Sequence, residues 1–227
     1  MTQKSAAVQA AGAALALGAV MLIITFVIHG APEPRLSDMM AVIAAESLRW
    51  QLAHWFAAVG LSLFAMAGII LLGARTRLAE SPFTVFAWGM FAIGALWTSS
   101  TAVAEATAVT HVAVAGDEAA FAAWWAFSEG RANGFAALAL AVAVIAGEET
   151  RTAEKATPVW AAGVAAVAAC GSFIGWVLNA WAGIGFGGPI WVASSILMCL
   201  WLLWLGTGLV RAETHHAANR RDAPSGA

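Results

Sequence analysis

The residues of this sequence that could do chemistry are ionisable groups set inside or beside long apolar segments. They are His29, His54, Glu105, His111, Glu129 and Arg131. A charge near the centre of a membrane costs about 2.5–3.5 kcal/mol on insertion scales, and such charges usually face a bundle interior or a wet cavity. We therefore expect these side chains to line a polar site.

The segment AFSEGRANGF holds the deepest charges of the chain. Glu129 and Arg131 are two positions apart, so on one helix they point in different directions and each needs a partner from another helix. We expect Arg131 to pair with Glu105, or Glu129 to pair with His54 or Arg49. The alternative is an interhelical ion pair that only fixes packing.

Helical phase divides the polar residues around Glu105 into two stripes. One stripe contains Thr98, Thr101 and Glu105, and the other contains Ser100, Thr107 and His111. At 100° per residue the two stripes point to different neighbours. Glu105 and His111 are therefore expected to face different surroundings.

The histidines raise the alternative of a metal or haem site. His29, His54 and His111 come from different segments at comparable height, which could form a donor set for a copper or zinc ion. His54 and His111 could instead be the two axial ligands of a b-type haem. The sequence contains no HxxxH or HExxH motif, so the other interpretation is interfacial histidines that hold no ligand.

Composition defines the kind of protein that must position these residues. The chain has 227 residues, of which 61% are hydrophobic and 11% charged, and a mean hydropathy of +0.80. This is typical of an all-α, multi-pass protein in contact with a lipid bilayer. The basic residues form no stripe, which excludes nucleic-acid binding. Neither Lys4 nor Lys155 lies at mid-membrane, which excludes a retinal Schiff base.

Six segments reach the roughly 20 apolar residues that a membrane-spanning helix requires. They are residues 6–28, 52–73, 83–104, 119–146, 159–182 and 190–210. We expect residues 1–212 to form a single six-helix domain. Residues 213–227 are expected to form a disordered cytoplasmic tail.

Arginine and lysine predict the orientation, because positively charged connections stay in the cytoplasm. The side of the N-terminus carries Lys4, Arg75, Arg77, Arg151, Lys155, Arg211, Arg220 and Arg221, against Arg35 and Arg49 on the other side. Both termini are therefore expected in the cytoplasm, with the chain in a bacterial-type inner membrane.

Depth along each helix places the polar residues near the outer surface. At 1.5 Å per residue, His54 lies about 28 Å and Glu105 about 33 Å from the cytoplasmic ends of their segments. The cytoplasmic half has no such cluster. The sequence thus predicts an outward-facing pocket at which a binding or transport-accessory protein receives a small polar or anionic ligand. The expected contacts are Arg131, Glu129, Glu105, His54 and Asn133.

Two further functions stay open at this point. One is a haem- or metal-dependent redox enzyme that uses the histidines, so the sequence does not decide whether the chain is an enzyme. The other is a structural subunit of a homo-oligomer or larger membrane complex, joined through small-residue faces such as GSFIG, residues 171–175. The same motif could instead pack the fifth span against the sixth.

Overall fold

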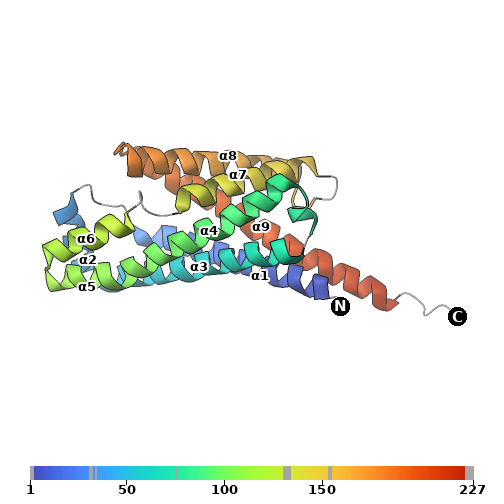
Figure 1. Ribbon diagram of the computed structural model, residues 1–227, viewed down its shortest axis with the longest axis horizontal. Helices are drawn as coiled ribbons and strands as arrows, with labels where there is room; N and C mark the ends of the chain where they lie inside the picture. Colours follow the sequence, from blue (N-terminus) through green and yellow to red (C-terminus); the bar gives the residue numbers. More distant parts are fainter. Residues whose placement is uncertain are drawn as a thin grey trace.

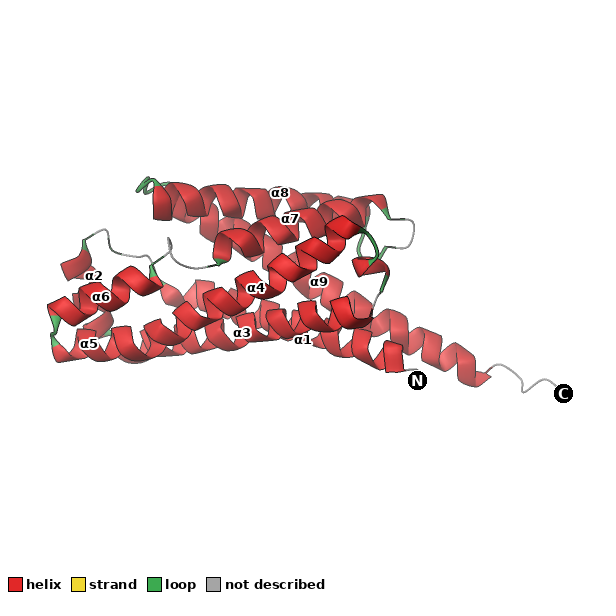
Figure 2. Cartoon of the chain, viewed as in Figure 1, coloured by secondary structure: helices red, strands yellow, loops and turns green. Residues whose placement is uncertain are grey.

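The protein is helical throughout the residues that its computed structural model describes, and no strand occurs among them (Figure 1, Figure 2). The described residues are 3–30, 33, 35–74, 76–129, 134–152 and 155–222. The α-helices are α1 (Gln3–His29), α2 (Leu36–Ala45), α3 (Ser47–Ala74), α4 (Pro82–Ala104), α5 (Thr110–Ala115), α6 (Glu118–Ser128), α7 (Phe135–Arg151), α8 (Val159–Trp176) and α9 (Gly187–Asp222). A 3-10 turn, η1 (Arg77–Ala79), precedes α4, and two π-helices, η2 (Glu105–Val109) and η3 (Val177–Trp181), extend α4 and α8. The predicted all-α class is confirmed.

The six longest elements form a closed ring in chain order. α1 packs on α3, α3 on α4, α4 on α7, α7 on α8, α8 on α9, and α9 returns to α1. Figure 1 shows that α1 begins and α9 ends toward the same end of the molecule, which we call the terminal end. The opposite end carries α2, α5 and α6, which we call the cap.

Five helices of the described chain are long and apolar enough to cross a membrane. They are Ser5–His29, Ser47–Ala74, Pro82–Ala115, Val159–Trp181 and Gly187–Arg211. The segment predicted as a fourth continuous span, residues 119–146, is instead interrupted. α6 ends at Ser128, the backbone at Glu129 is extended with a ψ of 157°, and α7 begins at Phe135. Gly134 precedes α7 at this break, and glycine weakens a helix interior by about 1 kcal/mol relative to alanine.

Glycine pairs lie where the helices of the ring cross. A Cβ added to Gly94 of α4 would lie 2.8 Å from the carbonyl oxygen of Gly134, and one added to Gly134 would lie 2.6 Å from that of Gly94. The same reciprocal contact joins α1 to α3, α1 to α9 and α8 to α9, through the pairs Gly18 and Gly60, Gly12 and Gly206, and Gly175 and Gly187. Small residues let helix backbones approach closely. In the GSFIG motif, Gly171 and Gly175 both face α9, so its role between these two helices is confirmed.

The cap has a hydrophobic core of its own, separate from the core of the ring. Its buried members are Met39 and Ile43 of α2, Trp50 of α3, Val109 of η2, Ala113 of α5 and Phe121 of α6. The continuous helix Pro82–Ala115 has 34 residues, about 51 Å at 1.5 Å per residue. This exceeds the roughly 30 Å of a hydrocarbon core. The cap packs on the end of this helix that carries η2 and α5.

Candidate functional site

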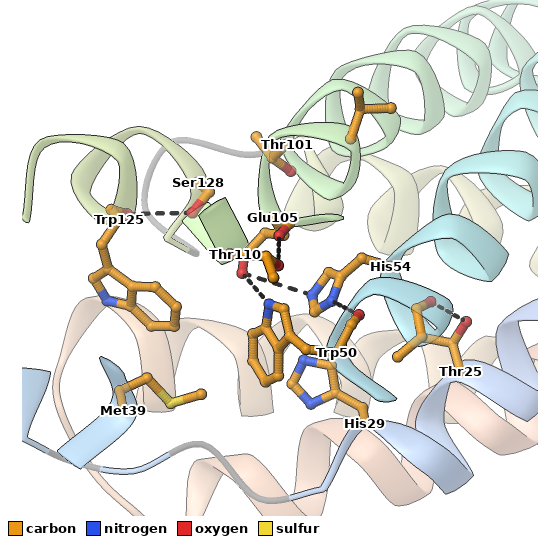
Figure 3. Close-up of polar contacts among 12 residues, drawn as sticks. Thr25, His29, Met39, Trp50, His54, Thr101, Glu105, Thr110, Trp125 and Ser128 are labelled. Carbon is orange, nitrogen blue, oxygen red and sulfur yellow. Dashed lines mark hydrogen bonds and ion pairs between the residues drawn. The ribbon is translucent and has the colours of Figure 1, made fainter. Parts of the chain in front are cut away.

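Buried polar side chains from α1, α3 and η2 meet where the ring joins the cap (Figure 3). His29 ends α1, Trp50 and His54 lie in the first turns of α3, and Glu105 begins η2. We call these four residues the His–Glu cluster. His54 and Glu105 are each only 7% exposed.

Glu105 reaches the cluster because the helix changes its winding there. The π-helix η2 starts at Glu105, and the hydroxyl of Thr110 donates a hydrogen bond to the Glu105 carbonyl oxygen at 2.7 Å. Short π-helical segments within α-helices are frequent at functional sites. The Glu105 side chain turns toward α3, whereas His111, six positions later, is exposed.

The carboxylate of Glu105 accepts one hydrogen bond and lies close to two further polar side chains. Its Oε2 accepts from the indole Nε1 of Trp50 at 3.2 Å and lies 3.8 Å from Nε2 of His54. Ser128, the last residue of α6, lies beside this side chain, and its hydroxyl donates to the carbonyl oxygen of Trp125 at 3.5 Å. Residues of two other elements, α3 and α6, therefore surround the carboxylate.

The hydrogen bonds of His54 fix its tautomer. Its Nδ1 lies 2.9 Å from the carbonyl oxygen of Trp50, and a carbonyl oxygen only accepts, so Nδ1 carries a hydrogen. The other ring nitrogen, Nε2, is thereby left to face Glu105. The histidine is oriented for proton exchange with the carboxylate.

His29 packs against the same two aromatic rings. Its ring centroid lies 5.0 Å from that of His54 and 4.6 Å from that of Trp50. Arg49 holds this end of α1, since its Nη1 donates to the carbonyl oxygens of Ile28 at 3.0 Å and His29 at 3.2 Å. Arg49 also forms an ion pair with Glu46, the residue between α2 and α3. A cation at the C-terminus of a helix satisfies its last carbonyl groups and complements its dipole.

A pocket of about 360 Å³ lies between α2 and α6. Its lining residues are Glu33, Leu36, Met39, Ala122, Trp125, Ala126 and Glu129. The centroid of the Trp125 ring lies 6.5 Å from that of Trp50, and the centroid of the Trp50 ring lies 4.5 Å from that of His54. Trp50 thus stands between the pocket lining and the buried histidine and carboxylate.

The structure brings some of the expected site residues together and separates others. His54 and Glu105 face each other, so His54 has Glu105 as its acidic neighbour where the sequence suggested Glu129. Glu129 lines the pocket. Arg131 and Asn133 lie outside the described residues. Trp50 and Ser128 were missed as partners of Glu105, although the spacing of Trp50 one turn before His54 was a usable signal.

The predicted metal or haem site finds no support among the described residues. Among the described residues, no group of three or more His, Cys, Asp and Glu side chains could hold a metal ion. His111 is exposed on α5, whereas His54 is buried with Nδ1 bound to a carbonyl oxygen. The paired arrangement that a b-type haem requires is therefore not formed by His54 and His111.

A second buried carboxylate lies at the terminal end and was not singled out from the sequence. Glu149 of α7 is 2% exposed, and its Oε1 accepts from the backbone N–H groups of Ala156 at 2.5 Å and Thr157 at 3.2 Å. The Thr157 hydroxyl accepts from the indole of Trp201 at 3.1 Å. These bonds anchor the connection between α7 and α8.

No family model, no curated protein and no solved structure matches the chain. Its function therefore has to be inferred from the site itself.

Proposed function

We propose that the chain is an integral membrane protein with six spans, in which α7 is the fourth. α7 has 17 residues, about 26 Å, which is close to the roughly 30 Å of a hydrocarbon core. It packs between α4 and α8 within the ring, as a spanning helix would. The basic residues gathered toward the terminal end favour a cytoplasmic location for both termini and an extracytoplasmic cap.

We further propose that the protein binds a small polar ligand between α2 and α6, as a binding or transport-accessory protein. The observation that carries this proposal is that Trp125 of the pocket lining neighbours Trp50 of the His–Glu cluster, with ring centroids 6.5 Å apart. An intramembrane or interfacial group of ionisable residues is a functional site by default. Here such a group lies directly behind an open pocket of about 360 Å³, a volume within the range of small-molecule sites.

The described lining favours a small organic cation as the ligand. Glu33 and Glu129 provide carboxylates, Trp125 an aromatic ring and Met39 a polarisable sulfur, and the described lining includes no Lys or Arg. Carboxylates and indole faces are the groups that attract quaternary ammonium ions. An anionic ligand held by Arg131, as suggested by the sequence, is the alternative.

Titration of the purified protein in lipid nanodiscs tests this proposal. Tetramethylammonium chloride and sodium acetate are the cationic and anionic probes, with sodium chloride at equal ionic strength as the blank. Binding is followed by tryptophan fluorescence and thermal shift. We expect saturable binding of tetramethylammonium, weakened about tenfold or more in Glu129→Gln and in Trp125→Phe, since each contact is worth about 1–2 kcal/mol.

Glu80→Gln, at an exposed carboxylate between η1 and α4, is the matched control and should bind as the wild type does. Binding of acetate alone would overturn the cationic assignment in favour of the anionic one. If neither probe binds, or if Glu129→Gln and Trp125→Phe bind as tightly as the wild type, the proposed pocket function is rejected.

A further inference from the structure

His54 and Glu105 form a buried pair that lacks room for water between its facing atoms. Nε2 of His54 and Oε2 of Glu105 lie 3.8 Å apart, and the side chains are 9% and 10% exposed. Figure 3 shows both side chains directed at each other from α3 and η2. Because Nδ1 of His54 donates to the Trp50 carbonyl oxygen, Nε2 is the atom that gains or loses a proton.

Charge counting determines how many protons this pair holds. With no proton between Nε2 and Oε2 the pair carries a net charge of −1, and two lone pairs face each other. With a proton on each atom the net charge is +1. With one proton the net charge is zero, whichever atom carries it. Burying a net charge is costly unless it is paired, so the singly protonated pair is the stable form.

The groups around the pair do not replace this internal compensation. His29 faces it from α1, and Arg49 of α3 is engaged by Glu46 and by the end of α1. From α6 the neighbour is the Ser128 hydroxyl, while His111 of α5 is exposed and Asp38 of α2 pairs with Arg35. Arg49, Asp38 and His111 therefore leave charge compensation to the pair itself and to His29, whose charge also acts on Glu105.

We propose that His54 and Glu105 together are a proton-binding site that holds one proton, and that Trp50 links this proton to the pocket between α2 and α6. Proton binding transfers one proton from solvent to the facing Nε2 and Oε2 atoms, and release returns it. No other bond is made or broken. The link to the pocket rests on the proposed ligand binding, whereas the proton site stands without it.

Trp50 provides the physical connection between the two. Its indole N–H donates to Glu105, its ring lies against that of His54 at an interplanar angle of 38°, and Trp125 of the pocket lining lies 6.5 Å away. A ligand that moves Trp125 and Trp50 alters the donor to the carboxylate, and this changes the affinity of the pair for its proton. By linkage, the proton then changes the affinity for the ligand by the same factor.

Infrared difference spectroscopy of the protein in nanodiscs, recorded across a pH titration, tests the proton site without any ligand. The Glu105 carboxyl signal is the band that disappears in Glu105→Gln. In the wild type we expect this band to titrate. In His54→Gln its midpoint should move by about one pH unit or more, a tenfold change in proton affinity. His111→Gln, on the exposed face of α5, should leave the midpoint in place.

A Glu105 band that does not titrate, or one that titrates at the same pH in His54→Gln and the wild type, would overturn the proton site. Circular dichroism confirms that each variant is folded. If His54→Gln fails to fold, His54→Asn, which keeps a polar side chain at the same depth, gives the same comparison.

Repeating the titration with saturating tetramethylammonium tests the link. The expected midpoint shift is about one pH unit in the wild type, with none in Trp50→Phe. A bound probe with no shift in the wild type overturns the link and leaves the proton site standing. A probe that does not bind overturns the proposed ligand function, and the ligand-free titration still decides the proton site.

Discussion

Trp50 and Glu105 are 55 positions apart in the sequence, yet the indole N–H of Trp50 donates to Oε2 of Glu105 at 3.2 Å. Trp50 also belongs to the hydrophobic core of the cap, together with Met39 and Phe121. One side chain thus joins the packing of the cap to the polar groups behind it. A change in the packing of the cap should therefore alter the polar groups behind it, and a change in those groups should alter the packing.

Replacing Trp50 by Phe should lower the free energy of unfolding by about 1–3 kcal/mol, because a buried acceptor loses its donor. The matched control is Trp97→Phe, since Trp97 is 53% exposed on α4 and its replacement should change the free energy by less than about 0.5 kcal/mol. Denaturant titration in mixed micelles measures both. Equal losses in the two variants would contradict the importance of the Trp50 bond.

His54 and Glu105 should show coupling in a double-mutant cycle. Replacing either one by Gln removes the partner that compensates the other, whereas replacing both removes the need for compensation. We expect the double variant to be less destabilised than the sum of the single variants by about 0.5–3 kcal/mol. The same cycle on His54 and the exposed His111 should be additive within about 0.5 kcal/mol. Additivity in the first cycle would show that the 3.8 Å contact has no energetic weight.

Helical phase was the most informative sequence signal around Glu105. It separated the stripe of Thr98, Thr101 and Glu105 from that of Ser100, Thr107 and His111. In the structure Thr101 and Glu105 are buried, while Ser100, Thr107 and His111 are exposed. The exposed hydroxyls of Ser100 and Thr107 donate to backbone carbonyl oxygens of their own helix, which explains why they tolerate an apolar face. Depth counting likewise placed His54 and Glu105 at one level.

Other features depend on contacts between distant segments and could not be obtained from periodicity. The π-helix that begins at Glu105 has no composition signal, and the break after Ser128 falls in a stretch whose hydropathy resembles a continuous span. The cap arises because α5 and α6 pack on α2, a pairing that no local pattern specifies. Buried Glu149 was overlooked because it sits in the charged run GEETR, which reads as a solvated helix end.

Replacing Gly94, at the crossing of α4 and α7, by Ala should destabilise the protein. A Cβ on Gly94 would lie 2.8 Å from both the Gly134 carbonyl oxygen and the Leu138 backbone nitrogen, so Gly94→Ala has to separate the two helices. We expect a loss of about 1–3 kcal/mol in the free energy of unfolding. Gly89→Ala on the same helix meets nothing within 4 Å and should be neutral or stabilising by up to about 1 kcal/mol. A destabilised Gly89→Ala beside an unaffected Gly94→Ala would contradict the packing of these helices.

At the terminal end, replacing Glu149 by Ala should lower the free energy of unfolding much more than replacing its neighbour Glu148. Glu149→Ala removes the acceptor of the N–H groups of half-buried Ala156 and buried Thr157 and leaves both without this partner. A loss of about 1–3 kcal/mol per unsatisfied group is expected. Glu148→Ala removes only a contact with Arg151, whose side chain is 79% exposed, so its effect should stay below about 1 kcal/mol.

Hydrogen exchange distinguishes the two glutamates more sharply than stability alone. In Glu149→Ala the amides of Ala156 and Thr157 should lose their protection, and the Trp201 indole, which donates to the Thr157 hydroxyl, should become more mobile. In Glu148→Ala both amides should exchange as in the wild type. If the amides stay protected in Glu149→Ala, the carboxylate is not what anchors the connection between α7 and α8, and the burial of Glu149 would need another explanation.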